Sequence, residues 1–239
     1  MIIDFEYQPV LEDYKKNGDM KLGSILKVLE NSGNKHSDIA GDAILEGSSC
    51  GKAWVLTDWM IDVIIYPKYG DKILARTWSE LVTHPLICTR DFEMYCNGEL
   101  SVKGTTKWIL LDLTSNRPCK ITIDIIDKYQ QEDKHTYDEA KLPRLAIPEV
   151  FNRELPISIR RVDIDFNDHV HNLTYLDYAL EVLPKELYDN RNFKKLRISY
   201  KMAVKSGEEI LCKYCELEGR HICCIFGTDG TLRTQIEFN

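Results

Sequence analysis

The stretch that decides the fold is Arg-Val-Asp-Ile-Asp-Phe-Asn-Asp-His-Val-His-Asn-Leu-Thr-Tyr, residues 161–175, where a strand-like run gives way to a helix-like one. Asn167 and Asp168 are residue types that commonly cap helix N-termini, so we expect a helix to open there. Apolar residues at helical spacing follow from Val170 to Leu183, and Pro184 then ends the run. The stretch therefore predicts a strand-to-helix junction that gathers polar side chains.

The first half of the chain repeats this organisation. Its apolar helical stripe consists of Leu22, Ile25, Leu26 and Leu29. The sequence Asn-Ser-Gly-Asn at 31–34 predicts the end of that helix. Residues 63–74 align without a gap with residues 200–211, and each segment carries glycine where a turn needs it. One long helix followed by antiparallel strands, occurring twice, predicts an α+β chain of two such units, each with a sheet curled around its helix.

The boundary between the halves is expected in the polar, charged stretch from Asp127 to Lys141. We predict an N-terminal domain at 1–128, a linker at 129–147 and a C-terminal domain at 148–239. The length of 239 residues and the hydrophobic content of 44% allow two cores of this size.

Composition excludes several classes of protein. The net charge of −7 argues against general nucleic-acid binding, which requires clustered cations. The acidic start of the sequence does not resemble a signal peptide, and no apolar run approaches the roughly 18 residues of a membrane span. We therefore expect a cytoplasmic protein without membrane partners. One basic stretch, residues 191–205, can steer an acidic partner or can simply keep a strand edge soluble.

The eight cysteines are interpreted as reduced core thiols, because a chain of this length needs no disulfide framework. Only Cys212-Lys-Tyr-Cys215, followed by Cys223 and Cys224, resembles a zinc motif. Positions three apart on a strand face opposite sides, so the sequence favours packing over metal binding. We expect no metal and no cofactor.

The chemistry of residues 165–169 suits acyl transfer. A helix start offers backbone N–H groups and a positive dipole end for an oxyanion. Asp165 can serve as general base or nucleophile, Asn167 can orient a water, and His169 can donate a hydrogen bond or carry a proton. The alternative is structural, because Asp, Asn and His near a helix start often only cap or turn the chain. A metal bound by His169 and His171 lacks a third well-spaced ligand.

The pattern Asp163-x-Asp165-x-Asn167-x-His169-Val-x-Asn172-x-x-Tyr175 resembles the signature of the acyl-acyl carrier protein (acyl-ACP) thioesterases. Motifs of the first half extend the resemblance: Gly51-Lys-Ala-Trp54, Tyr66-Pro67-x-x-Gly70-Asp71, Thr77-Trp78, Thr89-Arg90-Asp91-Phe92 and Trp108-x-Leu-x-Asp112. The resemblance implies a tandem (double) hotdog fold with an acyl pocket in the first lobe. It places the catalytic residues, Asp165, Asn167 and His169, in the second. Predicted pocket residues are Leu26, Leu29, Trp54 and Met60.

The sequence departs from the family pattern in two places. His171 stands where the family has Asn, and we interpret it as an exposed substitution. Ala203 occupies the position of a family glutamate proposed as the base, and Val204 that of a cysteine found in plant members. Strand alternation gives Ala203 the facing of Lys201 and Lys205, and Glu208 lies beyond the next turn. The hypothesis is that Asp165 activates water or attacks directly.

The leading prediction is hydrolysis of a fatty acyl phosphopantetheine thioester on acyl carrier protein, which ends fatty acid synthesis. The alternatives are an acyl- or aroyl-coenzyme A thioesterase and a non-catalytic acyl-binding protein, the latter suggested by Ala203. Carrier docking is predicted at Lys194, Lys195, Arg197 and Lys201. A homodimer is one expected assembly, and the alternative is a monomer, because two fused lobes can replace the dimer that single-hotdog proteins form.

Overall fold

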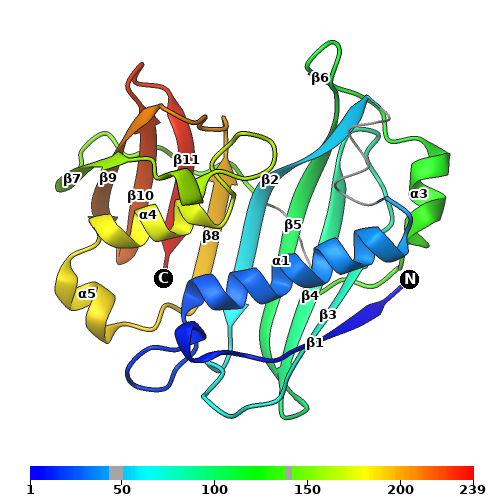
Figure 1. Cartoon of the computed structure of the whole chain (residues 1–239), viewed down its shortest axis with the longest axis horizontal. Helices are drawn as coiled ribbons and strands as arrows, with labels where there is room; N and C mark the ends of the chain where they lie inside the picture. Colours follow the sequence, from blue (N-terminus) through cyan, green and yellow to red (C-terminus); the bar gives the residue numbers. More distant parts are fainter. Residues whose placement is uncertain (43–50, 138–141) are drawn as a thin grey trace. The chain divides into compact units, whose positions relative to one another are not determined.

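The computed structural model describes residues 1–42, 51–137 and 142–239 (Figure 1). The chain divides into two compact units, Met1–Leu142 and Pro143–Asn239. The division falls inside the segment that the sequence suggests as a linker. Residues 130–137 of that segment lie on the first unit, where the Glu132 amide donates to the Ser79 carbonyl at 3.0 Å.

The first unit is an antiparallel sheet with one long helix packed on it. Its elements are β1 (Ile3–Tyr7), η1 (Leu11–Asp13), α1 (Leu22–Ile39), β2 (Lys52–Val63), β3 (Ile73–Ser79), β4 (Cys88–Cys96), β5 (Glu99–Asp112), β6 (Arg117–Pro118) and α3 (Ile123–Tyr129). The strand order is β1-β3-β4-β5-β2, and β6 pairs with β5. In Figure 1 the helix α1 runs across the strands of this sheet. The predicted apolar stripe of α1 is buried against the sheet.

The predicted end of α1 at 31–34 is wrong, because the helix continues to Ile39. Gly33 does not end the helix, and its lack of a side chain lets Arg90 pack closely against the helix backbone. A Cβ at Gly33 would lie 3.3 Å from Arg90 Nη1, and this nitrogen donates a hydrogen bond to the Gly33 carbonyl. A glycine inside a helix costs roughly 1 kcal/mol relative to alanine. Here it allows a buried guanidinium to reach the helix backbone, which the local sequence pattern does not reveal.

The second unit has the same plan with shorter elements. They are β7 (Arg153–Ser158), η3 (Arg161–Asp163), α4 (Thr174–Val182), α5 (Lys185–Asn190), β8 (Lys195–Tyr200), β9 (Glu209–Leu217), β10 (Arg220–Gly227) and β11 (Leu232–Phe238). The strand order is β8-β11-β10-β9-β7, all antiparallel. Helix α4 packs on one face of this sheet and buries Leu176, Ala179 and Val182. The alignment of 63–74 with 200–211 is confirmed, because both segments leave a strand, make a turn and enter the next strand.

The start of the second helix was predicted too early. Asn167 and Asp168 lie in a tight turn, and α4 begins only at Thr174. Asp168 has a left-handed backbone (φ +60°), which is incompatible with a helix N-terminus. The predicted end is correct, since α4 stops at Val182 before Pro184.

The cysteines of the second unit are core residues, as predicted. Cys212 and Cys215 face opposite sides of β9, and both are buried. Cys223 on β10 points toward α4, where its thiol donates to the Ala179 carbonyl at 3.4 Å. Burial raises the pKa of Cys212 to about 12, so its thiol is protonated at neutral pH.

Candidate active site

The loop from Ile164 to Val170 holds the predicted catalytic residues in a compact turn. Its ends pair as an antiparallel bridge, and the Asp165 amide donates to the His169 carbonyl at 2.8 Å. The Asp165 carboxylate folds back into the turn. Its Oδ1 atom accepts the Asn167 amide at 2.8 Å and the His169 amide at 3.3 Å. One carboxylate oxygen is therefore fixed by backbone donors, as in an Asx turn.

The remaining polar atoms of the loop are left for other partners. Within the described part of the chain, Asp165 Oδ2 and the side chains of Asn167 and His169 have no hydrogen-bond partner. Asn167 is exposed, whereas Asp165 and His169 are half-buried. The loop thus presents a carboxylate oxygen, an amide and an imidazole from one short turn.

Asp163, which directly precedes this loop, fixes its position through buried hydrogen bonds. It is 2% exposed and accepts hydrogen bonds from the Arg160 backbone and guanidinium and from the Tyr178 hydroxyl at 2.7 Å. Burial alone would raise the pKa of Asp163, but these hydrogen bonds outweigh it and hold the pKa below the ordinary value. Its carbonyl also accepts the His171 amide at 2.9 Å. The first aspartate of the signature is therefore structural.

A second segment, residues 201–208, is joined to the loop by backbone hydrogen bonds. His169 and Lys205 pair as an antiparallel bridge, and the Val170 amide donates to the Val204 carbonyl at 2.8 Å. The Val204 amide in turn donates to the buried Tyr175 hydroxyl at 2.8 Å. Through this hydrogen bond Tyr175 connects α4 to the segment 201–208. Ala203, beside these contacts, is exposed.

The geometry changes one part of the predicted chemistry. The amides of Asn167 and His169 bind Asp165, so they do not form the helix-start oxyanion hole that the sequence suggested.

His171 is also not an exposed substitution. It is half-buried, and its Nδ1 accepts the Leu173 amide at 3.3 Å. Burial lowers the pKa of His171, and the Asp165 charge opposes this only in part, so the imidazole is neutral near pH 7.

The predicted pocket residues lie in the first unit but do not all share a face. Leu26 and Leu29 are fully buried on the sheet-facing side of α1. Trp54 on β2 is half-buried, and its indole donates to Asp42 at 2.9 Å. Met60 lies between the buried Trp59 and Ile61 on β2. Since successive strand residues alternate, Met60 points to the face opposite to its two neighbours.

The predicted docking residues lie at β8 and its ends. Lys194, Lys195 and Lys201 are exposed. Arg197 is half-buried, and its guanidinium donates to the Pro143 carbonyl at 3.3 Å. Three of the four predicted cations therefore lie at the surface of the second unit.

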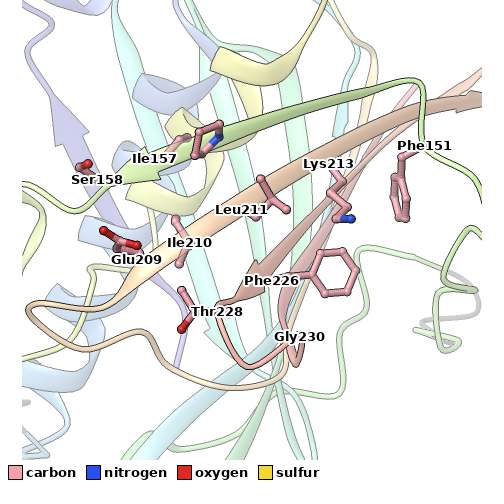
Figure 2. Close-up of a pocket in the computed structure, with 12 residues that line it drawn as sticks. Phe151, Ile157, Ser158, Glu209, Ile210, Leu211, Lys213, Phe226, Thr228 and Gly230 are labelled. Carbon is pink, nitrogen blue, oxygen red and sulfur yellow. The ribbon is translucent and has the colours of Figure 1, made fainter.

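Two surface cavities lie away from the loop. One, of about 530 Å³, is in the second unit between β7, β9 and the β10–β11 turn. Figure 2 shows Phe151 and Phe226 beside Lys213 in this cavity, and the Lys213 ammonium pairs with Glu154 at 2.7 Å. The other, of about 1130 Å³, lies in the first unit near Tyr95 and Arg76. Neither is lined by Asp165, Asn167 or His169.

Two helix-plus-antiparallel-sheet units in one chain define a double hotdog protein. The family model described as acyl-ACP thioesterase N-terminal domain matches residues 3–129, and the acyl-ACP thioesterase C-terminal domain matches residues 149–232. The chain therefore belongs to the acyl-ACP thioesterase family. None of its described helices is both long and apolar enough to cross a membrane.

Relatives and solved structures agree with this assignment. Oleoyl-acyl carrier protein thioesterase 1, chloroplastic, of Arabidopsis thaliana is 24% identical over 95% of this chain and 69% of its own length. The oleoyl-acyl carrier protein thioesterase of Coriandrum sativum is 25% identical over 74% of this chain and 53% of its own length. This chain thus spans about half to two thirds of these relatives.

Two solved structures share the fold. An acyl-ACP thioesterase from Bacteroides thetaiotaomicron superposes with a TM-score of 0.87 at 20% identity, covering 99% of this chain and 96% of that one. The 12:0-ACP thioesterase from Umbellularia californica gives a TM-score of 0.88 at 15% identity, covering 100% and 96%.

Proposed function

We propose that this protein hydrolyses fatty acyl thioesters of acyl carrier protein and releases free fatty acid and the carrier thiol. The observation that carries the proposal is the Asp165 turn, in which one carboxylate oxygen is fixed by two amides and the other is left for substrate or water. Membership of the family supports the choice of an acyl-ACP thioester as substrate.

In the proposed reaction Asp165 Oδ2 takes a proton from a water molecule as that water attacks the thioester carbonyl carbon. The carbon–sulfur bond then breaks, and the proton passes to the phosphopantetheine sulfur as it leaves. Asn167 and His169 orient the water and the carbonyl oxygen by hydrogen bonding. In the alternative, Asp165 Oδ2 attacks the carbonyl carbon, the carbon–sulfur bond breaks and the thiolate leaves. Water then hydrolyses the mixed anhydride to the fatty acid and the Asp165 carboxylate, and the proton released by the water goes to the thiolate.

Replacing Asp165 by Asn tests the assignment. We expect thiol release from acyl-ACP to fall at least about 100-fold, because an amide cannot accept the proton. Asp168→Asn is the matched control: it makes the same chemical change in the same turn, on an exposed side chain, and Asn tolerates the left-handed backbone. Full activity in Asp165→Asn would overturn the assignment.

The choice of carrier rests on a substrate panel. The exposed cations Lys194, Lys195 and Lys201, together with Arg197, favour an acidic carrier protein over coenzyme A. We expect activity on acyl-ACP to decline with salt more steeply than activity on the matching acyl-coenzyme A. Equal salt dependence would favour the coenzyme A ester, and thiol release from neither substrate would favour an acyl-binding protein. We also propose a cytoplasmic location, in contrast to the plant relatives, which are chloroplastic proteins.

A further inference from the structure

We propose that Glu208 is a positioning residue for the Asp165 turn, acting through the backbone of Lys205. The inference rests on the proposed function, because it assigns Glu208 a task in the same site. The family glutamate position is occupied by Ala203, and Glu208 lies on the far side of the next turn in the same segment.

Both carboxylate oxygens of Glu208 are engaged. Oε1 accepts the Lys205 amide at 3.1 Å, and Oε2 accepts Arg233 Nη2 at 3.1 Å. The Arg233 side chain is only 10% exposed, so this ion pair is shielded from water on the arginine side. A carboxylate held at both oxygens fixes the chain that it binds, and it is poorly suited to taking a proton from water.

Arg233 also makes hydrogen bonds to the start of the segment 201–208. Its backbone carbonyl accepts the amides of Lys201 at 2.8 Å and Met202 at 3.2 Å. Its guanidinium also contacts the Met202 sulfur and Asp229. The segment is therefore held at its start by the Arg233 backbone and at its end by the Glu208–Arg233 pair.

This segment in turn holds the Asp165 turn. Lys205 pairs with His169, and the Val204 carbonyl accepts the Val170 amide. Tyr175 joins the two, since its hydroxyl accepts the Val204 amide. Burial raises the pKa of Tyr175 to about 12, so its hydroxyl stays protonated at neutral pH and its oxygen is free to accept the Val204 amide. A shift of Lys205 thus displaces the residues that carry the proposed reaction.

The first unit contains a matched turn. Lys68 and Asp19 pair there as Lys205 and His169 do, and the Lys68 amide donates to Asp71 Oδ2 at 2.7 Å. The Met20 amide donates to the Pro67 carbonyl at 2.8 Å, as Val170 does to Val204. Asp71 therefore caps the equivalent turn in the half of the chain that lacks the proposed catalytic residues, and it serves as a control.

The test compares Glu208→Ala, Glu208→Gln and Asp71→Ala in the full chain. Amide hydrogen exchange and the kinetics of acyl-ACP hydrolysis are measured for each. In Glu208→Ala we expect faster exchange at Val170 and Lys205 and a kcat reduced roughly 10- to 100-fold, with a smaller change in KM. Glu208→Gln keeps an acceptor for Lys205 but loses the charge pair with Arg233, so it should retain more of kcat than Glu208→Ala and keep the parental pH profile. Asp71→Ala should speed exchange at Met20 and leave kcat unchanged.

Each contrary outcome has a distinct meaning. Parental exchange and kcat in Glu208→Ala would overturn the positioning role while Asp165→Asn still tests the chemistry. Loss of activity in Glu208→Gln equal to that in Glu208→Ala, with loss of the acidic limb of the pH profile, would make Glu208 the base and would also overturn positioning. If the parental protein releases no thiol from any substrate, the proposed function fails, and the exchange data alone then decide whether Glu208 orders the turn.

Discussion

Residues 11–21 of the first unit and residues 161–171 of the second form the same loop with different chemistry. Each begins with a short 3₁₀ turn, closes with an antiparallel bridge and includes a left-handed residue, Gly18 or Asp168. Each is anchored by a buried aspartate, Asp13 or Asp163, which accepts a backbone amide three residues earlier and a tyrosine hydroxyl. The backbone is therefore a shared scaffold.

The difference lies in which side chain satisfies the amides of the turn. In the first unit Asn17 does so: its Oδ1 accepts the Asp19 amide at 3.0 Å, and its Nδ2 donates to the Asp19 carboxylate. In the second unit Asp165 takes over this role and leaves the Asn167 side chain available. Lys15 stands in the position of Asp165, with its ammonium over the Tyr66 ring, and Asp19 pairs with Lys68. The charged side chains of the first loop thus have partners in the segment 66–68. In the second loop, Asp165 Oδ2 and the His169 side chain have no hydrogen-bond partner among the described residues.

The largest expected effect comes from giving the second loop the side chain of the first. Asp165→Lys should lower thiol release more than about 100-fold, because no carboxylate remains to accept the proton. The fold should persist, since Asn167 can accept the His169 amide as Asn17 accepts that of Asp19. Activity assays and circular dichroism check both parts. The reciprocal change, Lys15→Asp, should leave activity near parental, and a comparable loss there would contradict the assignment of chemistry to the second loop.

A smaller effect is expected from removing the two anchors. Asp13→Ala and Asp163→Ala should each lower the free energy of unfolding by about 1–3 kcal/mol, because buried donors lose a charged acceptor. Only Asp163→Ala should also lower kcat, since Asp163 holds the turn that carries Asp165. Urea unfolding and steady-state kinetics separate these effects. An equal loss of kcat in both variants would show that the two loops are not functionally distinct.

The smallest effect concerns acid stability. The pKa of Asp163 is held below its ordinary value in the folded protein, where Arg160 and Tyr178 donate to it. Its contribution is therefore fully present above the unfolded pKa of about 3.9 and is lost as the pH falls through the lower folded pKa. We expect the urea midpoint of Asp163→Asn to fall less steeply than that of the parental protein below about pH 4. Parallel curves would contradict the lowered pKa.

Several features of this comparison were visible in the sequence. Residues 163–175 pointed to the site, and the apolar stripes of both helices and the alignment of 63–74 with 200–211 pointed to two similar units. Asp13 and Asn17 recur at the spacing of Asp163 and Asn167, a signal that the helix and strand patterns do not capture. That recurrence indicates that the turn at 165–169 has a counterpart in the first half.

Other features escaped sequence reasoning because they depend on distant contacts. Gly33 was mistaken for a helix end, since its partner Arg90 lies on another element. Asn167 and Asp168 were mistaken for helix caps, because a tight turn and a helix start use the same residue types. The predicted oxyanion site at the helix start was wrong for the same reason.

The sequence by itself determined the two-unit organisation and the residues that carry the proposed chemistry, because hydrophobic periodicity and local motifs are properties of short stretches. Only the tertiary structure decided which oxygen of Asp165 is fixed, which residues anchor its turn and that Glu208 supports Lys205 beside it. These depend on hydrogen bonds between segments far apart in the chain, such as Val170 with Val204 and Glu208 with Arg233. Such pairings form only when the sheet has brought those segments together.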